Sequence, residues 1–287
     1  MEENNNQLPA TSVALIRGIH TEKEYYEGLF SFVENNICSS HEYRSVPIIV
    51  VAGRTYVSQC AVAAATADYK NVERNFLRFS DSLESFAKMA YFLDKKDEFI
   101  YEECMSVLDQ QEKTILPELR VLRKLIKKER GTYKEQLYIN RALAMGDIAC
   151  CFIFGKVLQF FLKKIKTTTG AVRRLRTEDC IKIEYRKDSA QFDVNKEHSE
   201  KLLREKIKAE KGDVIIATAC VGFFEEKSKK VITTLGAGGS IDTASLIAHA
   251  LTSNQLLVFH PTKNEDDSAF VYNRAKEYSN VKVEFSS

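Results

Sequence analysis

The sequence lacks an excess of charge of either sign. Its 287 residues carry 42 basic and 40 acidic side chains, which leaves a formal net charge of +2. A protein with so little net charge has no global field to draw it onto nucleic acid or an anionic membrane. Composition alone therefore indicates neither partner, and 44% hydrophobic with 29% charged residues instead predicts a folded unit with a full core.

Paired cysteine motifs and targeting segments are also absent. No two cysteines form a C-x-x-C pair, and the adjacent Cys150 and Cys151 cannot readily bridge one another or share a zinc site. The first residues, 1–6, are acidic and polar, unlike a signal peptide, and we find no apolar run of membrane-spanning length. We therefore expect reduced core thiols, a cytoplasmic setting and no membrane partner. The seven cysteines are Cys38, Cys60, Cys104, Cys150, Cys151, Cys180 and Cys220.

What is present is a change of hydrophobic period along the chain. Thr21 and Glu24 form a capping box that predicts a helix, and the β-branched run 48–51 predicts a buried strand that ends at Gly53. Residues 70–166 keep helical spacing and lack strand signals, which predicts a helical layer or subdomain. From residue 171 onward strands alternate with helices, which is typical of a mostly parallel, helix-covered sheet. Strands are expected at 181–185, 214–217, 231–235 and 256–259, and a helix at 240–251.

A glycine-rich segment, Thr233-Thr-Leu-Gly-Ala-Gly-Gly-Ser240, stands between a predicted strand and a predicted helix. Glycine permits unusual backbone dihedrals and close approach, and a helix N-terminus turns unpaired amides toward an anion. The segment is neither a dinucleotide fingerprint nor a P-loop, because it lacks the third glycine of the first and the Gly-Lys-Ser/Thr ending of the second. It predicts either an anion-binding loop or a tight turn capped by Ser240 without a ligand.

This segment, with Thr243 and Ala244 downstream, resembles the T-T-L-G-R-G-G-S-D-x-T-A motif of aspartate kinases. Weaker similarities follow in the order of that family. They are Thr11-Ser-Val-Ala14 to the end of K-F-G-G-T-S-V-A, Val50-Val-Ala-Gly-Arg-Thr55 to S-A-M-G-K-T, Met145-Gly-Asp147 to the S-x-G-E helix start, Ala190-Gln-Phe-Asp193 to A-x-V-D, and Val221-Gly-Phe-Phe224 to the G-F-I-G turn. The resemblance thus spans the chain, with one specific motif and several weak ones.

The resemblance implies the amino-acid-kinase fold, an α/β three-layer αβα sandwich with a mostly parallel sheet and a helical middle region. Residues 1–210 would form a substrate-side lobe, with the helical region at about 70–166, and residues 211–287 a truncated nucleotide-side lobe without an ACT domain. It also implies a homodimer that binds Mg-ATP and L-aspartate. The implied substrate-binding residues are Ser240, Thr243, Asp147 and Thr234. The implied nucleotide-binding residues are Gly236, Gly238, Gly239, Gly53, Thr55 and Lys263.

The chain departs from the family pattern at charged positions. Residues 7–10 read Gln-Leu-Pro-Ala where the family has a lysine and paired glycines, Ala237 replaces the loop arginine, and Ile241 replaces the aspartate after Ser240. Phosphoryl transfer depends on positioned charges, so these losses together predict a large loss of rate. We therefore expect a catalytically weakened or inactive homologue with a regulatory or assembly role.

Two other functions stay open. In an active kinase for L-aspartate or a similar acidic substrate, Lys263, Arg54 or Lys156 would supply the missing cation, and Asp242 the missing acid. In a non-catalytic scaffold, the helical region 70–166 would bind a partner protein or another copy of the chain.

Three local features have a functional and a structural interpretation. The stretch 156–187, with ten basic and three acidic residues, could bind an anion or nucleic acid, but its sparse aromatics favour a solvated helix face and a basic loop. His260 could act as a base, yet no matched acid or nucleophile stands nearby, which favours a structural role. Lys263 with Asp266 and Asp267 could bind magnesium and phosphate, and we favour a polar surface turn.

Overall fold

The computed structural model describes most of the 287 residues. The described ranges are 13–17, 23–35, 46–53, 55–88, 98–165, 171–186, 191–209, 214–226, 228–236, 238–253, 255–259, 265–278 and 282–286. Several residues named above therefore lie outside the described part of the chain: residues 7–10, Thr21, Cys38, Arg54, Ala237, His260 and Lys263.

A six-stranded sheet forms the centre of the molecule, and every one of its strand pairs is parallel. Its strands, in spatial order, are β10 (Lys282–Ser286), β9 (Gln255–Phe259), β1 (Val13–Ile16), β2 (Ile48–Val51), β6 (Val214–Thr218) and β3 (Val172–Leu175). The expected strands at 48–51, 214–217 and 256–259 are thus confirmed, as is the mostly parallel character of the sheet.

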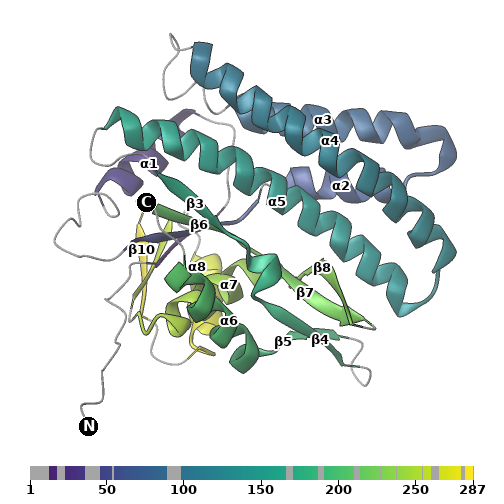
Figure 1. Ribbon diagram of the computed structural model, residues 1–287. Coiled ribbons are helices and arrows are strands. Elements are labelled where there is room, and N and C mark those ends of the chain that lie inside the picture. Colours follow the sequence, from purple (N-terminus) through teal and green to yellow (C-terminus); the bar gives the residue numbers. More distant parts are fainter. Residues whose placement is uncertain are drawn as a thin grey trace.

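Helices cover both faces of this sheet. Alternate side chains of its central strands point to opposite faces and so enter two separate hydrophobic clusters, one on each side. Ile49 and Val51 of β2 belong to one cluster, while Ile48 and Val50 belong to the other. The first face is covered by α1 (Lys23–Val33), α2 (Thr55–Thr66), α3 (Val72–Ala87), α4 (Glu98–Lys128) and α5 (Tyr133–Lys164). The second is covered by α6 (Lys196–Ala209), α7 (Gly239–Ala250) and α8 (Glu265–Ala275). The three-layer arrangement is visible in Figure 1.

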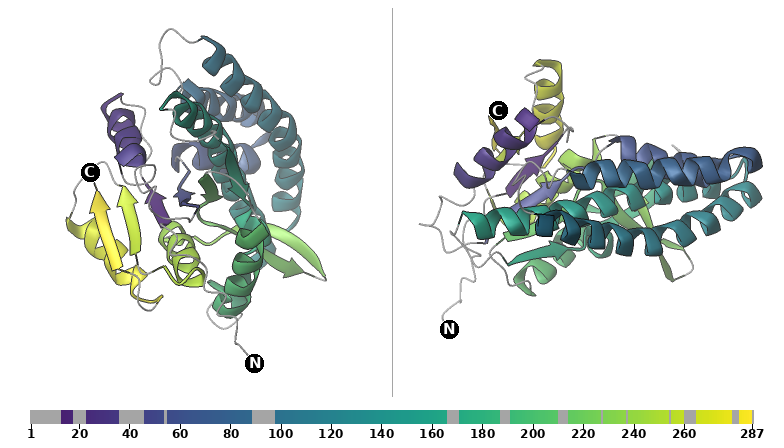
Figure 2. Two further views of the ribbon diagram at one scale, coloured as in Figure 1. Left: turned by 60° about the vertical axis from the view of Figure 1, so that its left-hand side comes forward. Right: turned by 90° about the horizontal axis from the view of Figure 1, so that it is seen from above.

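The helical middle region is also confirmed. Among the described residues between 70 and 165, helices are the only regular secondary structure, beginning with the short η2 (Tyr69–Asn71) that leads into α3. Seen from above in Figure 2, the blue-to-teal helices α3, α4 and α5 run side by side and extend past the central sheet. A left-handed glycine, Gly131, separates α4 from α5, and Thr132 caps α5 by accepting a hydrogen bond from the amide of Lys134.

One helix corrects the expectation that the chain has no apolar run of membrane-spanning length. An 18-residue window of α5 has a mean hydropathy of 1.6, which is apolar and long enough to cross a bilayer. However, 61% of that window is buried inside the protein, where α5 packs against α2, α4 and the sheet. Its apolar character is therefore explained by its place in the core.

A second, four-stranded sheet was not expected from the sequence, although two of its strands were. The strands predicted at 181–185 and 231–235 are confirmed, but they lie in this sheet and not in the parallel one. The second sheet consists of β5 (Gln191–Val194), β4 (Lys182–Arg186), β7 (Val221–Glu226) and β8 (Lys229–Thr234), with η4 (Thr177–Asp179) just before β4. The resemblance had interpreted Val221-Gly-Phe-Phe224 as a turn, and the structure corrects this: it opens the strand β7, paired antiparallel with β8. The sheet lies beside α5 (Figure 1), where Tyr133 stacks on Tyr185 at 5.2 Å between ring centroids.

Candidate functional site

A cavity of about 410 Å³ opens at the carboxyl ends of β1, β2 and β8, beside α2, α5 and the start of α7. We call it the strand-end cavity. In open α/β sheets, ligands bind outside the carboxyl ends of parallel strands. Its lining residues are Arg17, Ala52, Gly53, Thr55, Ser58, Leu143, Asp147, Cys220, Thr234, Gly236 and Ser240. Six of these were candidate residues from the sequence: Gly53, Thr55, Asp147, Thr234, Gly236 and Ser240.

Gly53 brings the turn after β2 directly against α5. A Cβ atom at this position would lie 2.8 Å from the Cα of Asp147 and closer still to its carboxylate. Any side chain there would push the turn away from the helix. Glycine at 53 is therefore needed for the close packing that places Thr55 and Asp147 around one cavity.

Asp147 is the acidic group of the cavity. It is only 9% exposed, and its carboxylate accepts a 2.8 Å hydrogen bond from the Ser58 hydroxyl. Burial raises the pKa of Asp147 to about 7, although the hydrogen bond from Ser58 acts in the opposite direction. Near neutral pH the carboxyl group thus exchanges between a protonated form and a charged form that can pair with a cation.

The glycine-rich loop adopts the backbone conformations that the sequence predicts. Gly236 and Gly238 have φ values of 82° and 81°, in the left-handed region that favours glycine, and Gly238 is the N-cap of α7. The Thr234 hydroxyl accepts a 3.3 Å hydrogen bond from the amide of Gly236. The loop therefore brings its backbone, and the positive end of the α7 dipole, to the wall of the cavity.

Two polar residues of α7 point to structural partners instead. The Thr243 hydroxyl donates to the carbonyl of Gly239 at 2.8 Å and accepts from the amide of Cys220 at 3.2 Å, and Thr243 is not among the lining residues. Both carboxylate oxygens of Asp242 accept hydrogen bonds from Arg274 of α8, at 2.8 and 2.7 Å. Thr243 thus ties the loop to the end of β6, and Asp242 ties α7 to α8.

Arg17 is a lining residue that the sequence analysis missed. It directly follows the buried strand Val13–Ile16, and its position at the carboxyl end of a central strand brings it into the cavity. The resemblance places the family lysine near residues 7–10, and the expected replacements were Lys263, Arg54 or Lys156. The signal that could have found Arg17 is a short apolar strand followed at once by a basic residue.

Cys220, another lining residue, has a left-handed backbone with φ of 62°. Burial raises the pKa of its thiol well above the ordinary value, so the side chain is a neutral wall of the cavity. The sequence had assigned it to the core with the other cysteines.

The remaining candidates lie elsewhere or outside the described residues. Lys156 forms a 2.8 Å ion pair with Glu103 of α4 and does not line the cavity. In the stretch 156–187, Arg174 forms an ion pair with Glu178 and donates a hydrogen bond to the Thr218 hydroxyl. Part of the basic charge of this stretch is therefore neutralised within the fold. Across the described part of the chain, no three His, Cys, Asp or Glu side chains are grouped so as to hold a metal ion.

This arrangement of sheet, helices and cavity has the fold of the aspartate kinases, which confirms the expected fold class. Two structures of Escherichia coli aspartokinase III, one with lysine and aspartate and one with aspartate and ADP, match with TM-scores of 0.57 and 0.55 at 15% identity. Clostridium acetobutylicum aspartate kinase matches with a TM-score of 0.52 at 11% identity.

These matches cover 86%, 86% and 90% of this chain but 49% of each of the three aspartate kinases, so the chain spans about half their length. No family model and no curated protein matches the sequence. At such low identity, the likeness establishes the fold, and function has to be argued from the cavity.

Proposed function

We propose that the strand-end cavity binds a small amino acid of the L-aspartate type, in an aspartate-kinase-like protein whose phosphotransferase activity is weakened or lost and whose role is regulatory or in assembly. The observation that carries this proposal is the gathering of six residues, chosen from separate sequence motifs, around one cavity that also contains Arg17.

The charges of the cavity suit a zwitterion. The guanidinium group of Arg17 can bind a carboxylate, and the ionised carboxylate of Asp147 can bind an ammonium group. The start of α7, where Ser240 lines the cavity, adds the positive end of a helix dipole for a second carboxylate. Both E. coli structures contain aspartate, which supports the choice of this ligand for testing.

Weakened catalysis is supported by the environment of two residues in α7. Ile241, which stands where the family has an aspartate, is completely buried in the apolar cluster beneath the sheet. The neighbouring acid, Asp242, is held by Arg274 and cannot readily take over that role. Since phosphoryl transfer relies on positioned charges, we expect a rate far below that of a working kinase.

An active kinase is the second candidate, and Arg17 is the observation that favours it. This cation lies in the cavity despite the apparent loss of the family lysine. Gly53, Thr55 and Gly236 could contact phosphate groups there. Mg-ATP, when bound, would supply the phosphoryl group that the substrate carboxylate accepts. Magnesium commonly binds through one or two carboxylates and the phosphates themselves. Among the described lining residues, Asp147 is the one carboxylate that could contact the ion.

A scaffold role for the helical region is a third candidate, supported by apolar side chains on its outer surface. Leu77 of α3 is 64% exposed and Val121 of α4 is 52% exposed, so each could contribute apolar surface to a contact with a partner or with a second copy in a homodimer. The six described cysteines are free thiols, which supports the proposed cytoplasmic setting.

An assay of ADP release in the presence of Mg-ATP, with and without L-aspartate, distinguishes these candidates when combined with thermal unfolding. The proposal predicts that L-aspartate raises the unfolding temperature while aspartate-dependent ADP release stays at background. Aspartate-dependent turnover that is lost in Arg17→Met would establish the active kinase instead. If neither ligand changes the unfolding temperature, the scaffold becomes the account to pursue.

A further inference from the structure

A second cavity, of about 390 Å³, lies on the opposite side of α5 from the strand-end cavity. We call it the α4–α5 cavity. On α5, residues 141, 145, 148 and 152 line it, whereas residues 143 and 147 line the strand-end cavity. At 3.6 residues per turn these two sets face nearly opposite directions. The helix thus separates two cavities, and each has a volume within the range of small-molecule sites.

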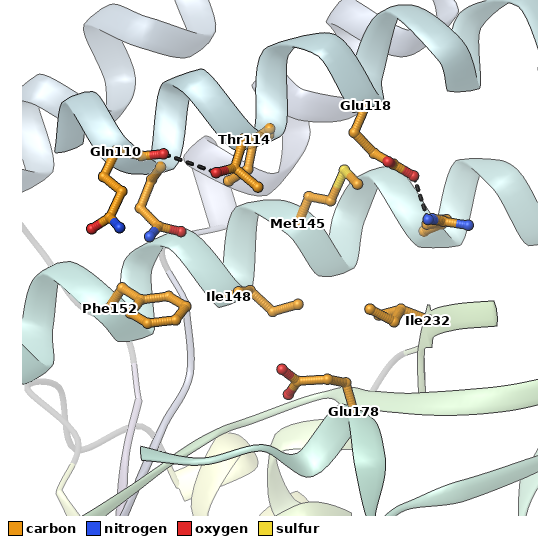
Figure 3. Close-up of a pocket in the computed structure, with 11 residues that line it drawn as sticks. Gln110, Thr114, Glu118, Met145, Ile148, Phe152, Glu178 and Ile232 are labelled. Carbon is orange, nitrogen blue, oxygen red and sulfur yellow. Dashed lines mark hydrogen bonds and ion pairs between the residues drawn. The ribbon is translucent and has the colours of Figure 1, made fainter. Parts of the chain in front are cut away.

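Most of the wall of the α4–α5 cavity is apolar. Figure 3 shows Met145, Ile148 and Phe152 along α5, with Ile232 of β8 approaching from the other side. Phe152 is 37% exposed, and the guanidinium of Arg174 lies 4.6 Å from its ring centroid. An apolar ring or branched chain in the cavity could therefore cover exposed apolar surface.

The charged groups that line the cavity all have ion-pair partners. Arg141 of α5 forms an ion pair with Glu118 of α4, and Glu178 of η4 forms ion pairs with Arg174 and Arg176. The fixed charges around the cavity are thus balanced, and an additional charge on a ligand would lack a free counter-charge. An uncharged ligand fits this environment best.

One donor in the wall is not satisfied. The Nε–H of Arg141 is buried and has no hydrogen-bond partner among the described residues. A buried donor without a partner is costly, so a small shift of the partly exposed Arg141 side chain that brings Nε to an acceptor oxygen of a ligand would be favourable. Gln110 and Gln111 of α4 add side chains that can donate or accept, and the Thr114 hydroxyl, which donates to the Gln110 carbonyl, can accept.

We propose that the α4–α5 cavity is a second ligand site, which takes an uncharged molecule with an aromatic or branched apolar body and a carbonyl acceptor. The site is independent of the amino-acid site proposed above. Its occupant would contact α5 and β8, the same two elements that carry Asp147 and Thr234 into the strand-end cavity.

Fluorine NMR with para-fluorobenzamide, a neutral ring that carries an amide, tests this proposal. The wild-type chain should broaden or shift the fluorine signal in a saturable way at millimolar concentrations of the probe. Thr114→Trp should weaken this binding at least about tenfold, because Thr114 is an exposed residue of α4 at which a larger side chain would fill the cavity. Lys113→Trp is the matched control, since Lys113 is also exposed on α4 but does not line the cavity.

Further variants keep the test decisive. Gln110→Trp is a second blocking variant if Thr114→Trp does not fold, and Arg141→Lys should weaken binding severalfold because it keeps the charge but removes the Nε donor. Thr55→Trp, which narrows the strand-end cavity, should leave probe binding unchanged. The proposal is overturned if the wild type shows no saturable binding of the probe. It is also overturned if Thr114→Trp binds the probe as well as Lys113→Trp does, or if Thr55→Trp alone loses binding.

Discussion

Asp147 determines how the strand-end cavity responds to pH. Burial raises the pKa of its carboxyl group from 3.8 to about 7 in the folded protein, and the unfolded chain has no such burial. Between these two values the folded state retains a proton that the unfolded state has released. The free energy of unfolding should therefore fall by up to ~4 kcal/mol as the pH rises from about 4 to about 7, and this contribution should then level off.

Asp147→Asn is expected to remove this part of the pH dependence. The asparagine oxygen can still accept the hydrogen bond from Ser58, but the side chain no longer has to be charged at high pH. The free energy of unfolding of the variant minus that of the wild type should therefore be larger at about pH 8 than at about pH 5. Urea denaturation at both values measures the difference, and an equal difference at the two pH values would contradict the assigned pKa shift.

Gly146 should tolerate substitution poorly although it lies inside a helix. A Cβ atom there would lie 2.6 Å from the Cα of Ser58 and 2.8 Å from its hydroxyl, so α2 and α5 would have to separate. Gly146→Ala is expected to destabilise the protein by ~1–3 kcal/mol, despite the better helix propensity of alanine.

Gly28→Ala is the matched control, because Gly28 is a helical glycine of α1 whose added Cβ would lie 3.7 Å from the ring of Phe259, an ordinary contact. This variant should be unchanged or more stable by roughly 0.5–1 kcal/mol. Chemical denaturation of both variants tests the argument, and a Gly146→Ala variant as stable as Gly28→Ala would show that the helices are less tightly packed than described.

At this scale, sequence patterns located residues whose role depends on local backbone chemistry. Gly236 and Gly238 were identified because left-handed turns need glycine, and the structure has them in that conformation. Arg17 and Ser58 could not be identified in this way, because they reach the cavity through the packing of β1 and α2 against distant parts of the chain. Thr243 belongs to the same motif as Ser240, yet its place one turn further along α7 directs it to the loop backbone.

Among the elements, the second sheet shows how far hydrophobic period serves as a guide. It predicted strands at 181–185 and 231–235, where β4 and β8 lie, but not that these strands form a sheet of their own with β5 and β7. The family resemblance interpreted the segment around Gly222 as a turn, but it forms β7, where a Cβ atom at Gly222 would clash with the carbonyl oxygen of Ile181. Glycine is present because another backbone approaches closely, which is a tertiary feature that local sequence does not reveal. By contrast, β2, β6 and β9 were predictable, since strands buried on both faces are continuous apolar runs.

The ion pair between α7 and α8 is expected to hold these two helices together. Asp242 has a side-chain exposure of 6% and Arg274 of 34%, so removing the arginine would leave a largely buried carboxylate without a partner. Arg274→Met should destabilise the protein by ~1–3 kcal/mol.

The double variant Asp242→Asn with Arg274→Met should recover part of that loss, because it leaves no unpaired charge. A double-mutant cycle from denaturation curves provides the measurement. Additive effects of the two single changes would mean that the pair contributes little coupling.

For the molecule as a whole, the layer order followed from the change of period along the chain. Residues 70–166 had helical spacing and the later chain alternated strands with helices, so a parallel sheet with a helical layer was predictable. The division into lobes at residue 210 stays a prediction. The α4–α5 cavity could not be predicted, because its wall combines residues from α4, α5, η4 and β8 that share no sequence motif.

A calorimetric titration with L-aspartate at about pH 6 and about pH 8 tests the central claim that the strand-end cavity is an amino-acid site. If Asp147 pairs with the ligand ammonium group in its charged form, affinity should rise roughly tenfold between these values, because the charged fraction rises through a pKa of about 7. Succinate, which lacks the ammonium group, should bind more weakly and without this increase. If L-aspartate fails to bind at millimolar concentration at both pH values, the account is contradicted.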